Sequence, residues 1–343
     1  MRIAVIGAGG FIGGWISEEL SERTDLEQRA CVRRWASSVR IARRGIPIAL
    51  ANIEDERALP SVLSNVDAVI NASMVAPSKE ANLAAVLWRA AATAGVDRFV
   101  QLSSAAVYGD ATGDIDETWP ARPLDEYGRG KVEMERTLVG LAARGKPEVV
   151  ILRPSIVYGP FSDAWTVRYA RRISAGRWLH LSSLAKGTCN LIYAQDLARA
   201  AIAASTISIR QPSLVLNLNG PEALQWNDYI ARFGEALGVQ CRLVPNVNTF
   251  RAKVIAAEML KRLARYDYVK RTYRSATGRA RATLGGVKMA VDLYPSLAEI
   301  ALLGRNVRYT ANRSESVLSS GTPTAVEEGL RRSAAWCHVH DIL

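Results

Sequence analysis

Short apolar runs alternate with longer amphipathic stretches along the first half of the chain. The runs are rich in Val, Ile and Ala, which is typical of strands buried on both faces of a parallel sheet. We predict six such strands, at residues 3–6, 29–32, 46–50, 68–71, 99–102 and 149–152. Stretches between them, such as 80–94 and 126–143, are long enough to be crossover helices. Strands that alternate with helices predict an α/β fold with a doubly wound parallel sheet.

The pattern loosens after about residue 153, where loops rich in Gly, Pro and Ser are interleaved with shorter helices. We therefore predict a sheet domain at residues 1–155, to which segments return from about 188–220. Residues 156–343 would form mainly a smaller C-terminal α/β substrate lobe. Ligands of such folds bind beyond the carboxyl ends of the strands, so we expect this lobe to bind the substrate.

The composition is that of a globular protein, because 49% of the 343 residues are apolar and 22% are charged. No apolar run approaches the roughly 20 residues that span a bilayer, and the N-terminus does not have the pattern of a signal peptide. We expect a cytoplasmic protein. The four cysteines are far apart and include no C-x-x-C pair, so we expect reduced thiols and no metal site.

Most of the net charge of +11 lies in one segment, residues 251–281. This segment has ten Lys or Arg and two acidic residues, a local net charge of +8. The rest of the chain is nearly balanced, so we predict no nucleic-acid partner. Within the segment, apolar residues recur at helical spacing at Ile255, Met259, Leu263, Tyr266 and Val269. This pattern predicts an amphipathic basic helix, for which three interpretations are open. The helix covers the active site, attracts an anionic substrate, or rests on the anionic inner face of a membrane.

A glycine-rich turn, GAGGFIG at residues 7–13, follows the first predicted strand and opens a predicted helix. Glycines allow the backbone to turn tightly and to approach a pyrophosphate, whose charge then meets the N–H groups of the helix N-terminus. The turn predicts a Rossmann-type dinucleotide-binding domain. The second strand is followed by Arg33 and Arg34 where an acid would bond the ribose of NAD, and arginine suits a 2′-phosphate. We favour NADP as the cofactor, with NAD as the alternative.

Tyr127 and Lys131 stand four residues apart in the second long helical stretch. Residues at this spacing share one face of a helix. A neighbouring ammonium favours the phenolate form of tyrosine and so helps it to exchange a proton near neutral pH. The pair suits interconversion of a hydroxyl and a ketone. Gly128 and Gly130 lie beside it although glycine is a poor helix former, and no local pattern accounts for Gly128.

Further motifs occur in a consistent order along the chain. They are NAS at 71–73, LSSAAVYG at 102–109, LRPSIVYGP at 152–160, NLIYAQDLA at 190–198 and PTAVEEGL at 323–330. Together with the G-x-x-G-x-x-G spacing and the Tyr-Lys pair, they resemble the extended branch of the short-chain dehydrogenase/reductases, the NAD-dependent epimerase/dehydratase family. The resemblance runs from about residue 1 to residue 336.

This resemblance implies roles for individual residues. The catalytic residues would be Ser104, Tyr127 and Lys131. The cofactor would be bound by Gly7, Gly10, Phe11, Ile12, Gly13, Arg33, Arg34, Asn52, Ile53, Ala72, Ser73, Tyr127, Lys131, Pro154 and Ile156. Substrate contacts would come from Met74, Ala105, Ala106, Arg168, Arg172 and Asn190. A small residue before the lysine, here Gly130, fits close packing near the cofactor in such proteins, and homodimers are usual among them.

The absence of certain residue types after the serine motif narrows the set of possible reactions. Dehydratases of this branch carry Asp-Glu after the catalytic Ser or Thr, and epimerases that act next to a keto group place a Cys there. This chain has Ala105 and Ala106, which cannot titrate. The remaining reactions are reduction or oxidation at one carbon and 4-epimerisation, and we expect a nucleotide-sugar substrate. Ile156 replaces an Asn that is common in nucleotide-sugar enzymes, and its loss removes a polar contact. The basic amphipathic segment keeps a lipid-linked or sterol-like substrate at a membrane surface as an alternative. A non-catalytic NADP-binding regulatory protein is a further alternative.

Overall fold

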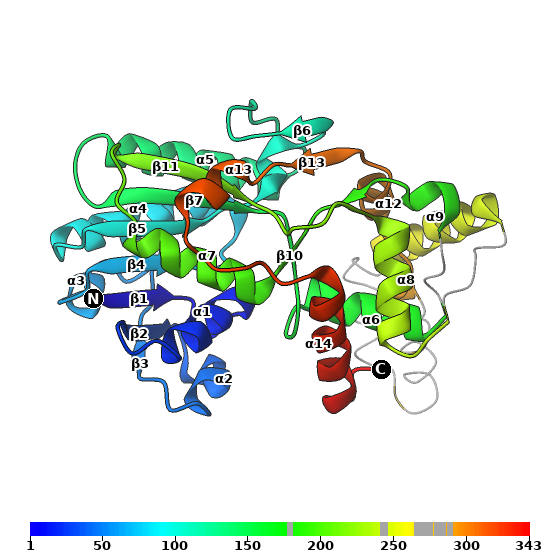
Figure 1. Ribbon diagram of the computed structural model, residues 1–343, viewed down its shortest axis with the longest axis horizontal. Helices are drawn as coiled ribbons and strands as arrows, with labels where there is room; N and C mark the ends of the chain where they lie inside the picture. Colours follow the sequence, from blue (N-terminus) through cyan, green and yellow to red (C-terminus); the bar gives the residue numbers. More distant parts are fainter. Residues whose placement is uncertain (177–180, 241–245, 264–276, 278–285, 287–290) are drawn as a thin grey trace. The chain divides into compact units, whose positions relative to one another are not determined.

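The computed structural model describes residues 1–176, 181–240, 246–263, 277, 286 and 291–343 (Figure 1). The chain divides into two compact units. Unit 1 consists of residues 1–159, 190–222 and 308–326, and unit 2 consists of 160–189, 223–307 and 327–343. The sequence analysis assigned residues 308–326 to the substrate lobe, whereas the structure places them in unit 1.

Unit 1 is built on a sheet of seven strands in the order β11-β7-β5-β4-β1-β2-β3. All neighbouring strands pair in parallel. The strands are β1 (Arg2–Ile6), β2 (Glu27–Val32), β3 (Ile48–Leu50), β4 (Ala68–Asn71), β5 (Arg98–Leu102), β7 (Glu148–Pro154) and β11 (Ser213–Leu218). The predicted Rossmann-type, doubly wound parallel sheet is confirmed. The strand order reverses between β1 and β4, which is where such sheets bind ligands.

Helices cover both faces of this sheet (Figure 1). One apolar cluster joins the sheet to α1 (Phe11–Ser21) and α7 (Ala194–Thr206). The other joins it to α3 (Leu59–Val62), α4 (Pro77–Thr93) and α5 (Glu126–Ala142). The central strands are mainly apolar because both of their faces are buried.

Shorter elements complete unit 1. They are η1 (Trp35–Ser37), α2 (Val39–Ala42), η2 (Ala105–Tyr108), β6 (Gly113–Ile115), β8 (Ile156–Tyr158), β10 (Leu191–Tyr193), β13 (Val307–Tyr309) and α13 (Asn312–Val317). β8 pairs in parallel with β10, and β13 pairs with β6. The Thr310 amide also donates to the Ile115 carbonyl oxygen at 2.9 Å. These bonds explain why the segment around residue 310 returns to unit 1.

Unit 2 has an aromatic core. Among the described residues, its elements are η3 (Asp163–Val167), α6 (Arg168–Ser174), η4 (Ser182–Ala185), β9 (Thr188–Cys189), β12 (Leu224–Gln225), α8 (Trp226–Ala236), α9 (Val247–Leu263), α12 (Leu297–Leu303) and α14 (Val326–Val339). The rings of Tyr169, Trp226 and Tyr229 are fully buried, with centroids about 6 Å apart. Such aromatic contacts stabilise the unit beyond their buried area.

Helix α9 contains the described part of the basic segment. It buries Phe250, Val254 and Ala257, whereas the predicted apolar stripe, from Ile255 to Leu263, is exposed. Two further members of that stripe, Tyr266 and Val269, lie outside the described residues. In the described part of the chain, every helix is too short or too polar to cross a membrane.

Cys31, Cys189 and Cys337 are free and buried. Burial raises the pKa of the Cys31 thiol to about 12, because a thiolate there would be poorly solvated. Cys241 lies outside the described residues.

Candidate active site

The glycine turn connects β1 to α1 at the carboxyl edge of the sheet. Gly7 has φ +80°, and its amide donates to the Cys31 carbonyl oxygen at 3.1 Å. A Cβ on Gly7 would lie 2.8 Å from the Ser73 Cα, and one on Gly13 would lie 2.2 Å from the Gly7 oxygen. Side chains are therefore excluded at both positions, and the turn packs closely against the Ser73 loop and against the first turn of α1.

The N-terminus of α1 is a fitting place for a diphosphate. Its N-cap, Gly10, has no side chain to satisfy the N–H groups of the first turn, which contains Phe11 and Ile12. Uncapped N–H groups and the positive end of the helix dipole attract an anion. The residues present therefore fit a dinucleotide cofactor, with its pyrophosphate over the turn.

A second loop lies under this turn. The Asn71 side chain, at the end of β4, accepts hydrogen bonds from the Ser73 amide at 3.2 Å and the Ser73 hydroxyl at 2.6 Å. It also donates to the Gln101 side chain at 2.8 Å. These bonds hold Ala72 and Ser73, two of the residues predicted to bind the cofactor, against Gly7.

The predicted adenosine side of the site follows β2 and β3. Arg33 and Arg34 are exposed directly after β2. Ile53 is buried, and the preceding Asn52 turns back to accept a hydrogen bond from the Glu54 amide at 3.2 Å. A surface hollow lies beside them and is lined by Ile53, Glu54, Glu56, Lys79, Asn82, Leu83 and Val86.

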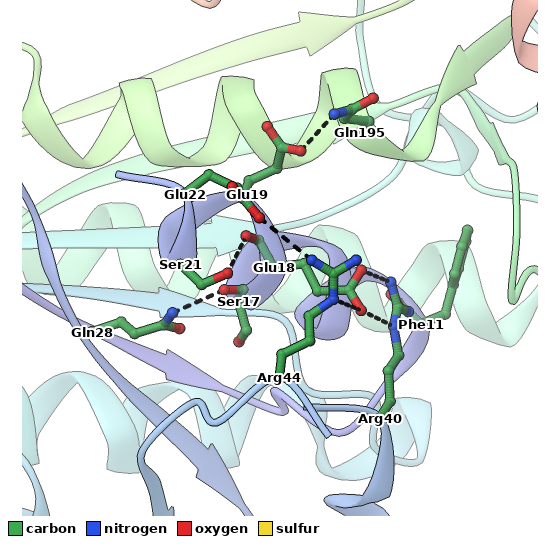
Figure 2. Close-up of polar contacts among 10 residues, drawn as sticks. All are labelled: Phe11, Ser17, Glu18, Glu19, Ser21, Glu22, Gln28, Arg40, Arg44 and Gln195. Carbon is green, nitrogen blue, oxygen red and sulfur yellow. Dashed lines mark hydrogen bonds and ion pairs between the residues drawn. The ribbon is translucent and has the colours of Figure 1, made fainter. Parts of the chain in front are cut away.

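An ion-pair cluster joins the segment after β2 to helix α1 (Figure 2). The Arg40 guanidinium bonds the Glu18 carboxylate at 2.9 and 2.6 Å and the Phe11 carbonyl oxygen at 3.2 Å. Arg44 approaches the same carboxylate at 3.4 Å. Arg40 and Glu18 are largely buried, so breaking their pair would leave an uncompensated charge. The cluster therefore holds Arg40 and Arg44, which follow Arg33 in the chain, against helix α1.

The predicted catalytic pair lies in the first two turns of α5. The Asp125 side chain caps this helix by accepting a hydrogen bond from the Gly128 amide at 2.8 Å. Tyr127 is 42% exposed, whereas Lys131 is only 7% exposed. The Lys131 nitrogen lies 5.5 Å from the centre of the Tyr127 ring. The structure thus brings the two residues together, with the phenol open to solvent and the ammonium inside.

Two glycines near the start of α5, Gly128 and Gly130, allow this helix to pack closely on both sides. A Cβ on Gly128 would lie 2.8 Å from the Ala106 carbonyl oxygen, and one on Gly130 would lie 2.8 Å from the Pro77 carbonyl oxygen. Gly128 therefore permits contact with η2, and Gly130 permits contact with the start of α4. This contact accounts for Gly128, which no local pattern explained.

Ser104 is the N-cap of η2, next to this contact. Its hydroxyl oxygen accepts a hydrogen bond from the Ala106 amide at 3.1 Å. Because that bond uses a lone pair, the hydroxyl hydrogen is left to donate elsewhere. Ser104, Tyr127 and Lys131 therefore lie on elements that touch one another within unit 1.

A buried polar network lies behind the pair and was missed by the sequence analysis. Arg153 bonds the Glu135 carboxylate at 3.0 and 2.6 Å and the Tyr108 hydroxyl at 2.8 Å. The Ser103 hydroxyl donates to the same carboxylate. Burial opposes the charge of Arg153, but its bonds to Glu135 outweigh this and raise its pKa, whereas burial raises the pKa of Tyr108. Glu135 follows Lys131 at helical spacing on α5, and this periodicity was the available signal.

The predicted substrate and nicotinamide residues of unit 1 differ in exposure. Met74 is 91% exposed, whereas Ala105 is buried and Ala106 is partly exposed. Ile156 is partly exposed and Pro154 is buried. Asn190 is buried, and its side-chain oxygen accepts hydrogen bonds from the Asn219 side chain and the Tyr309 amide, each at 3.2 Å.

The two predicted arginines of unit 2 lie in different environments. The Arg168 side chain is half exposed and lies 3.7 Å from the Asp163 carboxylate. Arg172 is 2% exposed, bonds the Glu299 carboxylate at 2.6 Å and reaches the Tyr294 carbonyl oxygen at 3.3 Å. The charge of Arg172 is therefore balanced inside unit 2.

Comparisons with known proteins agree with this architecture. The family described as "NAD dependent epimerase/dehydratase family" matches residues 3–215. A UDP-glucose 4-epimerase of Vibrio cholerae is 30% identical over 212 residues, which are 57% of this chain and 63% of the relative. A 2′-dehydrokanamycin reductase of Streptomyces kanamyceticus is 30% identical over 185 residues, 52% of each chain. This chain thus spans between half and two thirds of the length of these curated relatives.

Solved structures match over almost the whole chain. The UDP-glucuronic acid 4-epimerase of Bacillus cereus, in complex with NAD, has a TM-score of 0.73 at 16% identity and covers 99% of both chains. The UDP-glucose 4-epimerase of Thermotoga maritima, with UDP-glucose, has a TM-score of 0.72 at 18% identity and the same coverage. At these identities the structural likeness establishes the fold.

Proposed function

Because the chain belongs to the NAD dependent epimerase/dehydratase family, we propose that it is an NAD(P)-dependent oxidoreductase acting on one hydroxyl or keto carbon of a nucleotide-sugar. The observation that carries this proposal is the exposed Tyr127 phenol beside the buried Lys131 ammonium, on a helix packed against the Ser104 turn. The bound cofactor supplies hydride transfer.

Each residue of the trio has a distinct proposed role. Tyr127 exchanges a proton with the reacting oxygen, since it is the exposed member. Lys131 bonds the cofactor ribose and supports the phenolate form of Tyr127. Ser104 donates a hydrogen bond to the same substrate oxygen, where negative charge develops.

The proposed reaction is a 4-keto reduction or a 4-epimerisation. Both need only proton exchange and hydride transfer at one carbon, and both are compatible with alanine after Ser104. Ala105 and Ala106 cannot supply the further acid and base that a dehydratase uses. The matched relatives include a named 4-epimerase and a named reductase, which supports retaining both reactions in the proposal.

Nucleotides that copurify with the protein test this proposal. We expect mass spectrometry of the denatured protein to identify a nicotinamide dinucleotide, a sugar nucleotide, or both. Tightly retained NAD would favour an epimerase, which reuses its cofactor, whereas an NADP-loaded or empty site that binds added NADPH would favour a reductase. A protein that binds neither NAD(H) nor NADP(H) would contradict the proposal.

Arg33 is proposed to select the cofactor. We expect wild-type protein to bind NADPH more tightly than NADH, and Arg33→Asp to weaken NADPH binding about 10- to 100-fold, because one or two charge-assisted bonds to the 2′-phosphate are lost. Fluorescence titration with both cofactors measures this. Arg43→Asp is a matched control, because Arg43 is also exposed and lies just after α2. Equal binding of NADPH and NADH by wild-type protein would mean that Arg33 and Arg34 are surface charges.

Three finer points remain proposals. The exposed Arg168 is the better placed of the two predicted arginines to meet a sugar diphosphate, since Arg172 is buried in an ion pair. The exposed apolar side chains of α9 are compatible with attachment to an anionic membrane. A homodimer is proposed from the resemblance to the family alone.

A further inference from the structure

The Lys131 ammonium is bound by a carboxylate that the sequence analysis did not connect with the site. Its nitrogen donates to Glu80 Oε1 at 2.5 Å and to the Leu102 carbonyl oxygen at 3.2 Å. Glu80 is 6% exposed. The two bonds use two of the three N–H donors of the ammonium and leave one to face Tyr127 and the cofactor.

The position of Glu80 follows from the packing of two helices. Glu80 lies in the first turn of α4, and Gly130 allows the start of that helix to approach α5 closely. The positive end of the α4 dipole stabilises a carboxylate in this turn. The negative charge of Glu80 is thus built into the fold and is directed at Lys131, which lies 51 residues further along the chain.

Other charged side chains near Tyr127 and Lys131 are paired with an opposite charge or exposed to solvent. Glu135, one helical turn beyond Lys131, is bound by Arg153, and Lys79 pairs with Glu54 at 3.1 Å. The remaining charged residues in the first half of α5 are exposed, namely Glu126, Arg129 and Glu133. Glu80 is therefore the charge that opposes Lys131.

We propose that Glu80 is a positioning residue of the site: it fixes the Lys131 ammonium beside Tyr127 and opposes its charge, so that Lys131 stabilises the Tyr127 phenolate less than an unpaired ammonium would. An unopposed ammonium would draw Tyr127 toward phenolate, whereas a neutral ion pair exerts a much weaker pull. This inference rests on the proposed role of Tyr127 as the group that exchanges a proton with the substrate.

The two directions of the proposed reaction start from different forms of Tyr127. In reduction, the bound cofactor would supply hydride to the carbonyl carbon and be oxidised, and the carbonyl oxygen would take the Tyr127 proton. Water then reprotonates the phenolate. Oxidation of a hydroxyl starts instead from phenolate, and 4-epimerisation begins with such an oxidation. Because a catalyst does not change the equilibrium, the pair between Glu80 and Lys131 affects how fast each direction starts and not which direction prevails.

Ionisation of Tyr127 can be measured without a substrate. The ultraviolet absorbance of tyrosinate is followed against pH in each protein, and the curve of the same protein carrying Tyr127→Phe is subtracted. We expect Glu80→Gln to form Tyr127 tyrosinate at a pH lower by about one unit, because the ammonium is no longer opposed. Lys131→Met should shift the curve to higher pH. The double variant should return close to the wild-type curve, because it has lost both charges.

Glu18→Gln is the matched control, because Glu18 is a similarly buried carboxylate that pairs with Arg40 elsewhere in unit 1. It should lower stability and leave the Tyr127 curve unchanged. If Glu80→Gln does not fold, Lys131→Met is compared with the double variant instead. Removing the Glu80 carboxylate must lower the pH at which Tyr127 ionises in the Lys131→Met protein as well. Coincident curves with and without Glu80 would overturn the inference. The proposed function is tested separately by turnover of Tyr127→Phe.

Discussion

Replacing Tyr127 by Phe should lower turnover at least about 100-fold and leave NADPH binding within about twofold of the wild-type protein. The substitution removes only the hydroxyl that exchanges a proton with the substrate, and a positioned acid or base typically contributes 10²- to 10⁴-fold. The ring remains, so its contact with Lys131 at 5.5 Å is retained. Turnover is measured from NADPH absorbance with a set of UDP- and dTDP-linked 4-keto sugars, and binding from NADPH fluorescence.

A matched Tyr→Phe control is available within unit 1. Tyr309 stacks on Tyr108 with ring centres 5.7 Å apart, and it is not among the residues assigned to the site. Tyr309→Phe should therefore keep most of the activity. If Tyr127→Phe retained full turnover, the proton would have to come from another group, and the proposed mechanism would be wrong.

Replacing Arg153 by Met should destabilise the protein by about 3–5 kcal/mol, the range for breaking one side of a buried ion pair. Arg153 and Glu135 are 9% and 5% exposed. Without Arg153, the Glu135 carboxylate would be left uncompensated in the interior, and the Tyr108 hydroxyl would lose its donor. Urea unfolding, followed by circular dichroism, measures the change in the free energy of unfolding.

Two variants separate loss of the pair from a general loss of packing. Combining Arg153→Met with Glu135→Leu should cost less than Arg153→Met alone, because no unpaired charge remains. Arg2→Met removes a partly exposed pair with Glu27 and should cost below about 1 kcal/mol. A loss below about 1 kcal/mol for Arg153→Met would show that Glu135 is satisfied without it.

Much of the candidate site could be proposed from the sequence because its motifs are local. The glycine turn, the four-residue step from Tyr127 to Lys131 and the serine motif each depend on residues close in sequence. The strand pattern was equally informative, since parallel strands buried on both faces are nearly continuous apolar runs. The strand β11 was harder to predict because it returns to the sheet from the later half of the chain.

Other features could not be predicted because they depend on contacts between distant segments. Glu80 is, by sequence, an ordinary acid in the first turn of a helix. Gly128 is, by sequence, only an unfavourable residue in a helix. Their roles appear once α5 lies against the Pro77 and Ala106 carbonyl oxygens. The environment of Arg172 was hidden for the same reason, because its partner Glu299 lies 127 residues away.

The sequence by itself determined the doubly wound sheet, the turn suited to a dinucleotide, and the identity of the Tyr127 and Lys131 pair. Periodicity and short motifs carry that information. Only the tertiary structure decided the electrostatic setting of the pair, because charges act through space and not along the chain. It placed the Lys131 ammonium in the interior, opposed it with Glu80, and left the Tyr127 phenol exposed.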